Sequence, residues 1–143
     1  KYNNDISGNG ARKQYSNRWN SYGTPMLYTA ESAALCAVEL NKAYSPYSKL
    51  LNYYLLEIET PNQKPLLIDA AFYEEDWINN IQTSKLLGDF FVNENEFLTL
   101  KVASVWIQNC YNYLINPNHK DFNKVKIIAK YSFPFTGKLF NKM

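Results

Sequence analysis

The stretch NRWNSYGTPMLYTAES, residues 17–32, joins a polar loop and a Gly/Pro turn to a short apolar run, and an Ala-rich segment follows it. The apolar run at 25–28 predicts a strand. Thr29 is placed to cap a helix that continues to about residue 42. Glu31 then falls in the first helical turn, where a negative charge suits the helix dipole. This part of the sequence therefore predicts a loop, a strand and a helix in direct succession.

Two charged side chains in this region have a chemistry that a loop and an apolar helix do not require. Arg18 offers a planar fork of N–H donors that suits phosphate oxygens. Glu39 ends the apolar run AALCAVE. A carboxylate among apolar residues lowers stability unless it has a charged or hydrogen-bonding partner, so its presence points to a partner or to a function. Together they indicate a binding site for an anionic ligand beside a carboxylate that takes part in catalysis. Two alternatives stay open: Arg18 as a surface charge or an ion-pair partner of Glu39, and Glu39 as a helix-end residue facing water.

Strand and helix patterns continue along the rest of the chain without a repeat or a domain boundary. Strand patterns occupy residues 50–59, 66–68, 97–103 and 125–131. Spaced apolar residues indicate a helix within 72–90, and residues 1–24 are expected to form a loop. These patterns predict one α+β domain with mainly antiparallel sheets and about three helices.

Composition excludes several classes of function. The 143 residues carry a net charge of +2, and 20% of them are charged, which is too weak a basic balance to indicate nucleic-acid binding. No stripe of basic and aromatic residues suggests RNA as a ligand. No apolar stretch approaches the roughly 20 residues of a membrane span.

The two cysteines, Cys36 and Cys110, form no CxxC motif and no cluster with the single histidine. A zinc site is therefore not expected. Cys36 lies among Ala, Leu and Val, so a buried small hydrophobic side chain is the natural interpretation. Sparse, unpaired cysteines fit a reducing cytoplasm.

Six short segments occur in an order that is characteristic of one bacterial family. They are DISGNGA at 5–11, RWN at 18–20, GTP at 23–25, YTAES at 28–32, LKVAS at 100–104 and NYLINPNH at 112–119. On these motifs the chain resembles the RES domain, the toxin half of a bacterial toxin–antitoxin pair. The family's signature polar residues are an Arg, a Glu and a Ser, and the resemblance matches them to Arg18, Glu39 and Ser104.

The chain departs from the family pattern at a few places. Ser16 and Asn17 stand where the family usually has two glycines, and Ala103 stands where it often has proline. These changes affect local backbone geometry more than chemistry. The resemblance implies a single RES domain over residues 1–143, without the short strand that the family normally has before Tyr2.

The resemblance implies a fold akin to that of ADP-ribosyltransferases and an activity on NAD+, which is a substrate here and not a cofactor. Known members cleave the nicotinamide–ribose bond with water or phosphate, or transfer ADP-ribose to a protein, and loss of NAD+ stops growth. A cognate antitoxin with a helix-turn-helix domain usually blocks the site. The resemblance thus implies a cytoplasmic toxin that does not itself bind nucleic acid, and it allows a homodimer within the toxin–antitoxin complex. A module that only binds the antitoxin, without catalysis, is the alternative from another class.

The resemblance also assigns roles to individual residues, and no metal is among them. Arg18 is expected to bind phosphate or ribose, Glu39 to stabilise the positive charge that develops on the sugar, and Ser104 to position the ligand. Tyr28 is expected to flank the nicotinamide or its ribose, and Asn112 is a further candidate ligand contact. The attacking nucleophile stays open.

Other polar residues near these motifs are expected to have supporting roles. Trp19 and Asn20 are more suited to holding the Arg18 loop than to contacting a substrate. His119, Asn116 and Asn112 are each open to a structural or a ligand-binding role.

Overall fold

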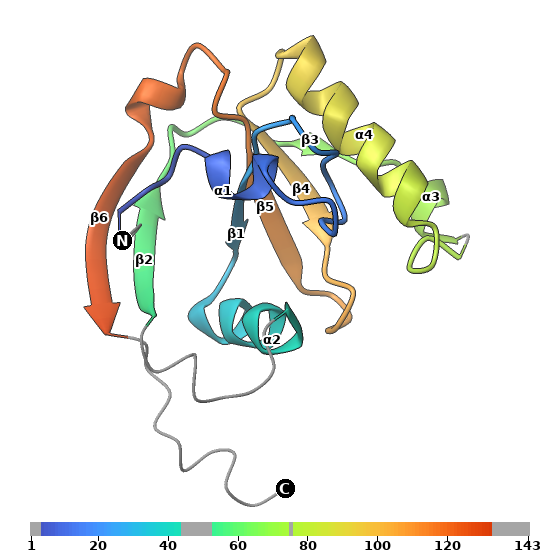
Figure 1. The fold of residues 1–143 in the computed structure, drawn as a ribbon, viewed down its shortest axis with the longest axis horizontal. Coiled ribbons are helices and arrows are strands. Elements are labelled where there is room, and N and C mark those ends of the chain that lie inside the picture. Colours follow the sequence, from blue (N-terminus) through green and yellow to red (C-terminus); the bar gives the residue numbers. More distant parts are fainter. Residues whose placement is uncertain (1–3, 44–52, 75, 133–143) are drawn as a thin grey trace, which may run out of the picture.

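The computed structural model describes residues 4–43, 53–74 and 76–132, which form two sheets flanked by helices (Figure 1). The larger sheet has the strand order β1-β5-β4-β3, and the smaller sheet pairs β2 with β6. The strands are β1 (Leu27–Ala30), β2 (Tyr54–Glu59), β3 (Leu66–Leu67), β4 (Thr99–Ala103), β5 (Tyr111–Ile115) and β6 (Lys126–Ser132). Among these strands β3 alone runs parallel to its neighbour, and the other pairs are antiparallel.

The described part of the chain contains four α-helices, two of them of five residues or fewer. They are α1 (Asn9–Arg12), α2 (Ala33–Ala43), α3 (Ala70–Glu74) and α4 (Ile81–Glu94), and a 3₁₀ turn, η2, spans Phe122–Lys124. The prediction of a single α+β domain with mainly antiparallel sheets is confirmed. The short helix α1 interrupts the loop expected over residues 1–24, of which residues 1–3 lie outside the described residues.

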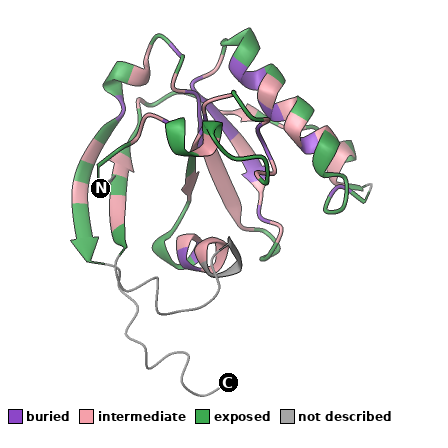
Figure 2. Cartoon of the chain, viewed as in Figure 1, coloured by how far each residue is buried: buried purple, intermediate pink, exposed green. Residues whose placement is uncertain are grey.

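The main core lies between one face of the large sheet and α4. Leu100, Val102 and Leu114 project from the sheet into this core and are at most 1% exposed. The side chains that cover them are Trp19, Met26, Trp77, Phe91 and Val92. Figure 2 shows the buried residues gathered along β4 and along the side of α4 that faces the sheet. Complete burial of each large apolar side chain contributes roughly 1.5–3 kcal/mol, so this core fixes α4 and the N-terminal loop against the sheet.

A smaller core lies between the two sheets. Leu98, Ile115 and Val125 form its buried centre, and Ile58 of β2 and Leu27 of β1 pack against them. Ile115 lies next to Leu114, which enters the main core, because successive residues of a strand point to opposite faces. Strand β5 is therefore covered on both sides at its end.

The contact between α4 and the N-terminal loop is unusually close. A Cβ atom added to Gly88 would lie 1.7 Å from the carbonyl oxygen of Trp19. Only a residue without a side chain permits the loop backbone to approach the helix in this way. The close approach sets the position of Arg18, the residue that precedes Trp19.

Helix α2 begins later than the sequence pattern indicates. Thr29, the expected cap, lies in β1, and its hydroxyl donates to the carbonyl of Tyr113 at 2.6 Å. The cap is Ser32, whose Oγ accepts a hydrogen bond from the N–H of Leu35. Glu31 precedes the helix, so the expected dipole role is wrong. The backbone N–H of Glu31 continues the pairing of β1 with β5 by donating to the carbonyl of Tyr111. The Glu31 carboxylate accepts a hydrogen bond from the N–H of Tyr111 at 3.1 Å.

The helix expected within 72–90 is divided into α3 and α4 by a turn that includes residues 76–80. Asn80 begins α4, with its side-chain oxygen accepting a hydrogen bond from the N–H of Thr83. The apolar pattern places Trp77 in a helix, but Trp77 occupies the turn, where its ring packs against Trp19. A capping Asn therefore interrupts an apolar pattern that otherwise resembles one continuous helix.

Strand β5 is absent from the sequence prediction, although it lies in the middle of the large sheet. Its sequence YNYLI lacks clear alternation of polar and apolar residues, because Leu114 and Ile115 are buried on opposite faces while the three residues before them are only partly buried. The expected strand at 50–59 is confirmed for Tyr54–Glu59, and residues 50–52 lie outside the described residues.

Candidate active site

Glu39 is the centre of a cluster of hydrogen bonds at one end of the large sheet. Its Oε1 atom accepts a hydrogen bond from the hydroxyl of Ser104 at 2.9 Å and another from the Nδ2 of Asn112 at 2.7 Å. Glu39 lies on α2, Ser104 directly follows β4, and Asn112 is the second residue of β5. Figure 1 shows α2 at the end of the sheet where β1 leads into it. Three separate elements therefore bring three of the predicted site residues together.

The loop between β4 and β5 fixes the orientation of the Ser104 hydroxyl. Its oxygen accepts hydrogen bonds from the N–H groups of Trp106 and Ile107, at 3.1 and 3.3 Å. The N–H of Ser104 donates to the carbonyl of Cys110 at 2.8 Å and closes the loop. A hydroxyl has one hydrogen to donate, and with both acceptor positions in use, that hydrogen points to Glu39.

Arg18 is held over the turn between α3 and α4. Its Nη1 and Nη2 atoms donate to the carbonyls of Trp77 and Ile78, at 3.2 and 2.6 Å. The guanidinium carbon lies 5.5 Å from the centroid of the Trp77 ring, in the range of a cation–π interaction. Two carbonyls and an aromatic face therefore fix the direction of the cation before any ligand is present.

Arg18 and Glu39 interact through their charges but do not form an ion pair. Burial lowers the pKa of Arg18, and the negative charge of Glu39 opposes this effect. Among the described residues, no carboxylate lies within 4.0 Å of the Arg18 guanidinium. The alternative that Arg18 is only the salt-bridge partner of Glu39 is therefore wrong.

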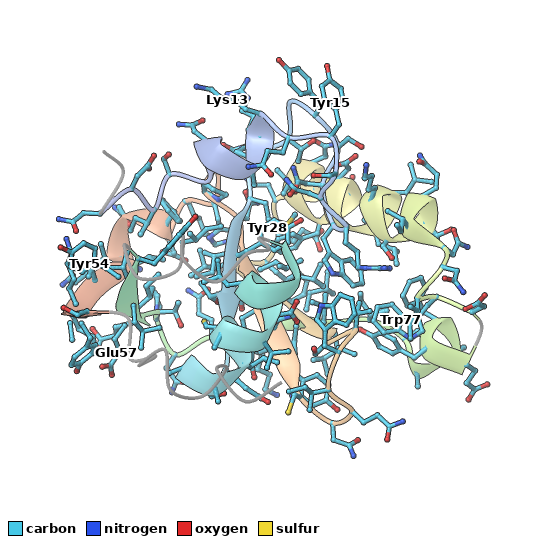
Figure 3. All side chains as sticks on the ribbon, turned by 60° about the horizontal axis from the view of Figure 1, so that its bottom comes forward. Lys13, Tyr15, Tyr28, Tyr54, Glu57 and Trp77 are labelled. Carbon is cyan, nitrogen blue, oxygen red and sulfur yellow. The ribbon has the colours of Figure 1, made fainter. Side chains whose placement is uncertain are left out.

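Tyr28 presents its ring to solvent while its hydroxyl is buried. The hydroxyl donates to Oδ1 of Asn20 at 2.7 Å and accepts from the N–H of Trp19 at 3.1 Å. Burial of the hydroxyl raises the pKa of Tyr28 above its usual value. The residue as a whole is nevertheless 39% exposed, and Figure 3 shows it beside α2. Tyr28 pairs with Leu114, which is two residues from Asn112 on β5. Residues two apart on a strand point to the same face, so Tyr28 and Asn112 lie on the same face of the sheet.

The residues next to Arg18 hold its loop, as the sequence predicted. Asn20 is completely buried, and its Nδ2 atom donates to the carbonyls of Ala11, Ser21 and Thr24. Trp19 is 3% exposed and belongs to the main core. Neither side chain is therefore free to take part in binding a substrate.

Two further candidates, Asn116 and His119, lie away from the Glu39 cluster, beyond the opposite end of β5. The Nδ2 of Asn116 donates to the carbonyl of Val92 and to Oδ1 of Asn95. His119 is buried, and its Nδ1 accepts the N–H of Asp121 at 3.1 Å. Both residues stabilise the turn that follows β5, so a structural role explains them.

Trp77 and Tyr73 belong to the site but were not identified from the sequence. Trp77 stacks on Arg18, and Tyr73 packs edge-on against Trp77. The hydroxyl of Tyr73 accepts a hydrogen bond from the N–H of Ala103, immediately before Ser104. The grouping of three aromatic residues in FYEEDW, residues 72–77, was the available signal. Trp77 and Phe72 also line an open pocket at the start of α4.

Neither a cluster of metal-ligating side chains nor a membrane-spanning helix occurs in the described part of the chain. No three His, Cys, Asp or Glu side chains gather there in a way that could hold a metal ion. None of the helices described is long and apolar enough to cross a bilayer.

The chain is similar in sequence to one protein family and to several bacterial toxins. The family model for the RES domain matches residues 2–136 of this chain. The Toxin Res of Photorhabdus laumondii is 28% identical over 138 residues, which cover 93% of this chain and 86% of that protein. The Toxin Res of Pseudomonas putida is 30% identical over 130 residues, which cover 86% of this chain and 85% of that protein. The Prs ADP-ribosylating toxin of a Sphingobium species is 30% identical over 129 residues, which cover 85% of this chain and 78% of that protein.

Proposed function

Because this chain belongs to the RES domain family, we propose that it is a toxin that consumes NAD+ by cleaving the bond between nicotinamide and ribose. Two relatives that match most of its length carry the name Toxin Res. The structural observation that carries the proposal is the Glu39 carboxylate, held through one oxygen by Ser104 and Asn112. Glu39 and Arg18 are proposed to act on the substrate directly, and Ser104, expected as a third catalytic residue, to act through its hydrogen bond to Glu39.

The chemistry of the bond explains the need for a held carboxylate. Departure of nicotinamide leaves positive charge on the ribose, as in glycoside hydrolysis. Oε1 of Glu39 accepts two hydrogen bonds, while Oε2 accepts none from the residues that the structure describes. Oε2 can therefore face the developing charge, and a carboxylate whose direction is already fixed stabilises that charge without reorganising.

Arg18 and Tyr28 suit the two ends of such a ligand. A guanidinium has five N–H donors, and two of those of Arg18 go to backbone carbonyls. The remaining donors can bind pyrophosphate oxygens, for which the Arg fork is well shaped. The exposed ring of Tyr28 lies on the sheet face that also carries Asn112, where it can flank the flat nicotinamide ring.

A second candidate function is transfer of ADP-ribose to a protein. The relative named Prs ADP-ribosylating toxin, 30% identical to this chain, favours it. Both reactions break the same bond and use the same carboxylate, so they differ only in the nucleophile that attacks the ribose. The family resemblance also supports a cytoplasmic site of action and neutralisation by a cognate antitoxin with a helix-turn-helix domain.

The test is the concentration of NAD+ over time with purified protein freed of antitoxin, using NAD+ labelled in its adenosine half. The Glu39→Gln variant keeps the shape of the side chain but loses its charge, and we expect its rate to fall by about 100- to 1,000-fold. Glu94→Gln is the matched control, because Glu94 is exposed at the far end of α4 and should leave the rate unchanged (Figure 1).

The fate of the label separates the candidates. Free labelled ADP-ribose supports hydrolysis, a phosphorylated product supports phosphorolysis, and label retained on a protein band supports transfer. Equal consumption by the unmutated protein and Glu39→Gln would reject the role of Glu39. A folded protein that neither consumes NAD+ nor labels any protein would favour the module that only binds the antitoxin.

A further inference from the structure

We propose that Asn112 is a positioning residue that aims the Glu39 carboxylate, an inference that rests on the proposed cleavage of NAD+. The sequence left Asn112 open to a ligand-binding or a structural role, without naming a partner for it. In the structure its Nδ2 atom donates to Oε1 of Glu39 at 2.7 Å, the shortest hydrogen bond that the described residues make to this carboxylate. Asn112 therefore acts on the reaction through Glu39.

The strand that carries Asn112 makes it a rigid support. Strand β5 lies between β1 and β4, and Asn112 pairs with Ala30 on one side and with Val102 on the other. Val102 is fully buried. The backbone of Asn112 is thus held by ladders on both sides, and its side chain has only two rotatable bonds. Glu39 extends from a helix on a longer side chain, which loses more conformational freedom when it is fixed.

Ser104 alone would not fix the direction of the carboxylate. A single donor leaves the carboxylate free to turn about that hydrogen bond. A second donor, arriving at the same oxygen from a neighbouring strand, removes this freedom and directs Oε2 away from both donors. Because Ser104 follows β4 and Asn112 belongs to β5, the register of the two strands sets this direction.

A positioning role and a ligand-binding role predict different kinetics. Loss of a ligand contact raises KM, whereas loss of the aim of Glu39 lowers kcat with little change in KM. The charge of the side chain at position 112 also affects Glu39. The neutral amide of Asn112 donates to the Glu39 carboxylate without adding a charge, whereas a carboxylate at position 112 would repel it.

Two isosteric variants test the inference in the NAD+ assay. Asn112→Leu removes the donor, and we expect kcat to fall about 100-fold, the cost of misplacing a reacting group by about 1 Å. We expect KM to stay within about threefold of the unmutated value. The control Asn118→Leu, at an exposed position in the turn after β5, should change neither constant.

Asn112→Asp supplies a readout that a purely structural role would not change. At neutral pH the introduced carboxylate repels Glu39 and cannot donate. As the pH falls, the two carboxyl groups share one proton, as close carboxylate pairs do, and the introduced group becomes a donor again. Its kcat relative to that of the unmutated protein should therefore rise severalfold as the pH is lowered, while that of Asn118→Asp should not.

The outcomes separate this inference from the proposed function. An inactive unmutated protein would overturn both. An active protein whose Asn112→Leu variant keeps its kcat, or loses activity only through KM, would overturn the positioning role alone. If Asn112→Leu does not fold, as judged by circular dichroism, the pH profile of Asn112→Asp decides, and a constant ratio at all pH values would reject the inference.

Discussion

The hydroxyl of Tyr28 donates to Oδ1 of Asn20 at 2.7 Å, and this bond ties strand β1 to the loop that carries Arg18. Asn20 is completely buried, and its other amide atom binds backbone carbonyls at Ala11 and Thr24. The Arg18 loop has no regular secondary structure of its own, and this side-chain network holds its shape together with the packing of Trp19 against α4. Loss of this network should therefore weaken the whole support of the cation.

Tyr28→Phe should destabilise the protein. The change leaves Oδ1 of the buried Asn20 and the N–H of Trp19 without the hydroxyl that each contacts. We expect the free energy of unfolding, from urea denaturation, to fall by about 1–3 kcal/mol. Tyr22→Phe is the control, because Tyr22 is 56% exposed and stacks on Tyr15 through its ring. Equal stability of the two variants would contradict the anchoring role.

Gly88→Ala should destabilise the packing of α4 against the loop. The new Cβ would lie 1.7 Å from the carbonyl oxygen of Trp19, so the loop backbone must move. We expect a loss of about 1–3 kcal/mol or more in thermal or urea unfolding. Gly10→Ala is the matched control, since its new Cβ would meet no heavy atom within 4 Å. The close contact would be disproved by a Gly88→Ala variant as stable as Gly10→Ala.

Arg18→Lys should weaken NAD+ binding although it keeps the positive charge. Lysine lacks the planar fork that donates to the carbonyls of Trp77 and Ile78, and it stacks less well on the Trp77 ring. We expect KM for NAD+ to rise about tenfold, the effect of losing one charged hydrogen bond. Arg12→Lys, on the exposed side of α1, serves as the control and should keep the original KM. An unchanged KM in both variants would remove Arg18 from the binding site.

Asp121→Asn should lower stability in a manner that depends on pH. The Asp121 carboxylate accepts hydrogen bonds from Lys124 and Gln63, which lower its pKa from 3.8 to about 2. Because the folded pKa is depressed, the stabilisation is complete above about pH 4 and is lost as the pH falls through about 2. The urea midpoint of the variant should lie below that of the unmutated protein at neutral pH, and the two should converge near pH 2.

Lys124→Met provides a check on the cause of that effect. It removes the donor that contributes most to the lowered pKa of Asp121. The pH-dependent part of the stability should therefore shrink, although the hydrogen bond from Gln63 remains. A difference between Asp121→Asn and the unmutated protein that is equally large at all pH values would show that the carboxylate charge is not responsible.

The sequence was informative where the signal is local. Period-2 alternation predicted β4, and the position of Glu39 in an Ala-rich helix marked it as unusual. The order of short motifs identified the family and named Arg18 and Ser104 as site residues, although their catalytic roles stay predictions. The first two signals depend only on neighbouring residues and on the geometry of one strand or helix, and the third depends only on the order of short motifs along the chain.

The contacts of these residues follow from the packing of elements that are distant in the chain. Glu39 and Asn112 are 73 residues apart in the chain, and Arg18 is 59 residues from Trp77. These contacts require that β5 insert between β1 and β4 and that a turn divide α3 from α4. Strand β5 shows no clear alternation, since Leu114 and Ile115 at its end are buried on opposite faces, so the sequence did not predict the strand that carries Asn112. The chemical groups of the site can be read from the amino-acid sequence, but the pairing of distant strands brings them together, because strand register depends on which side chains pack into the core.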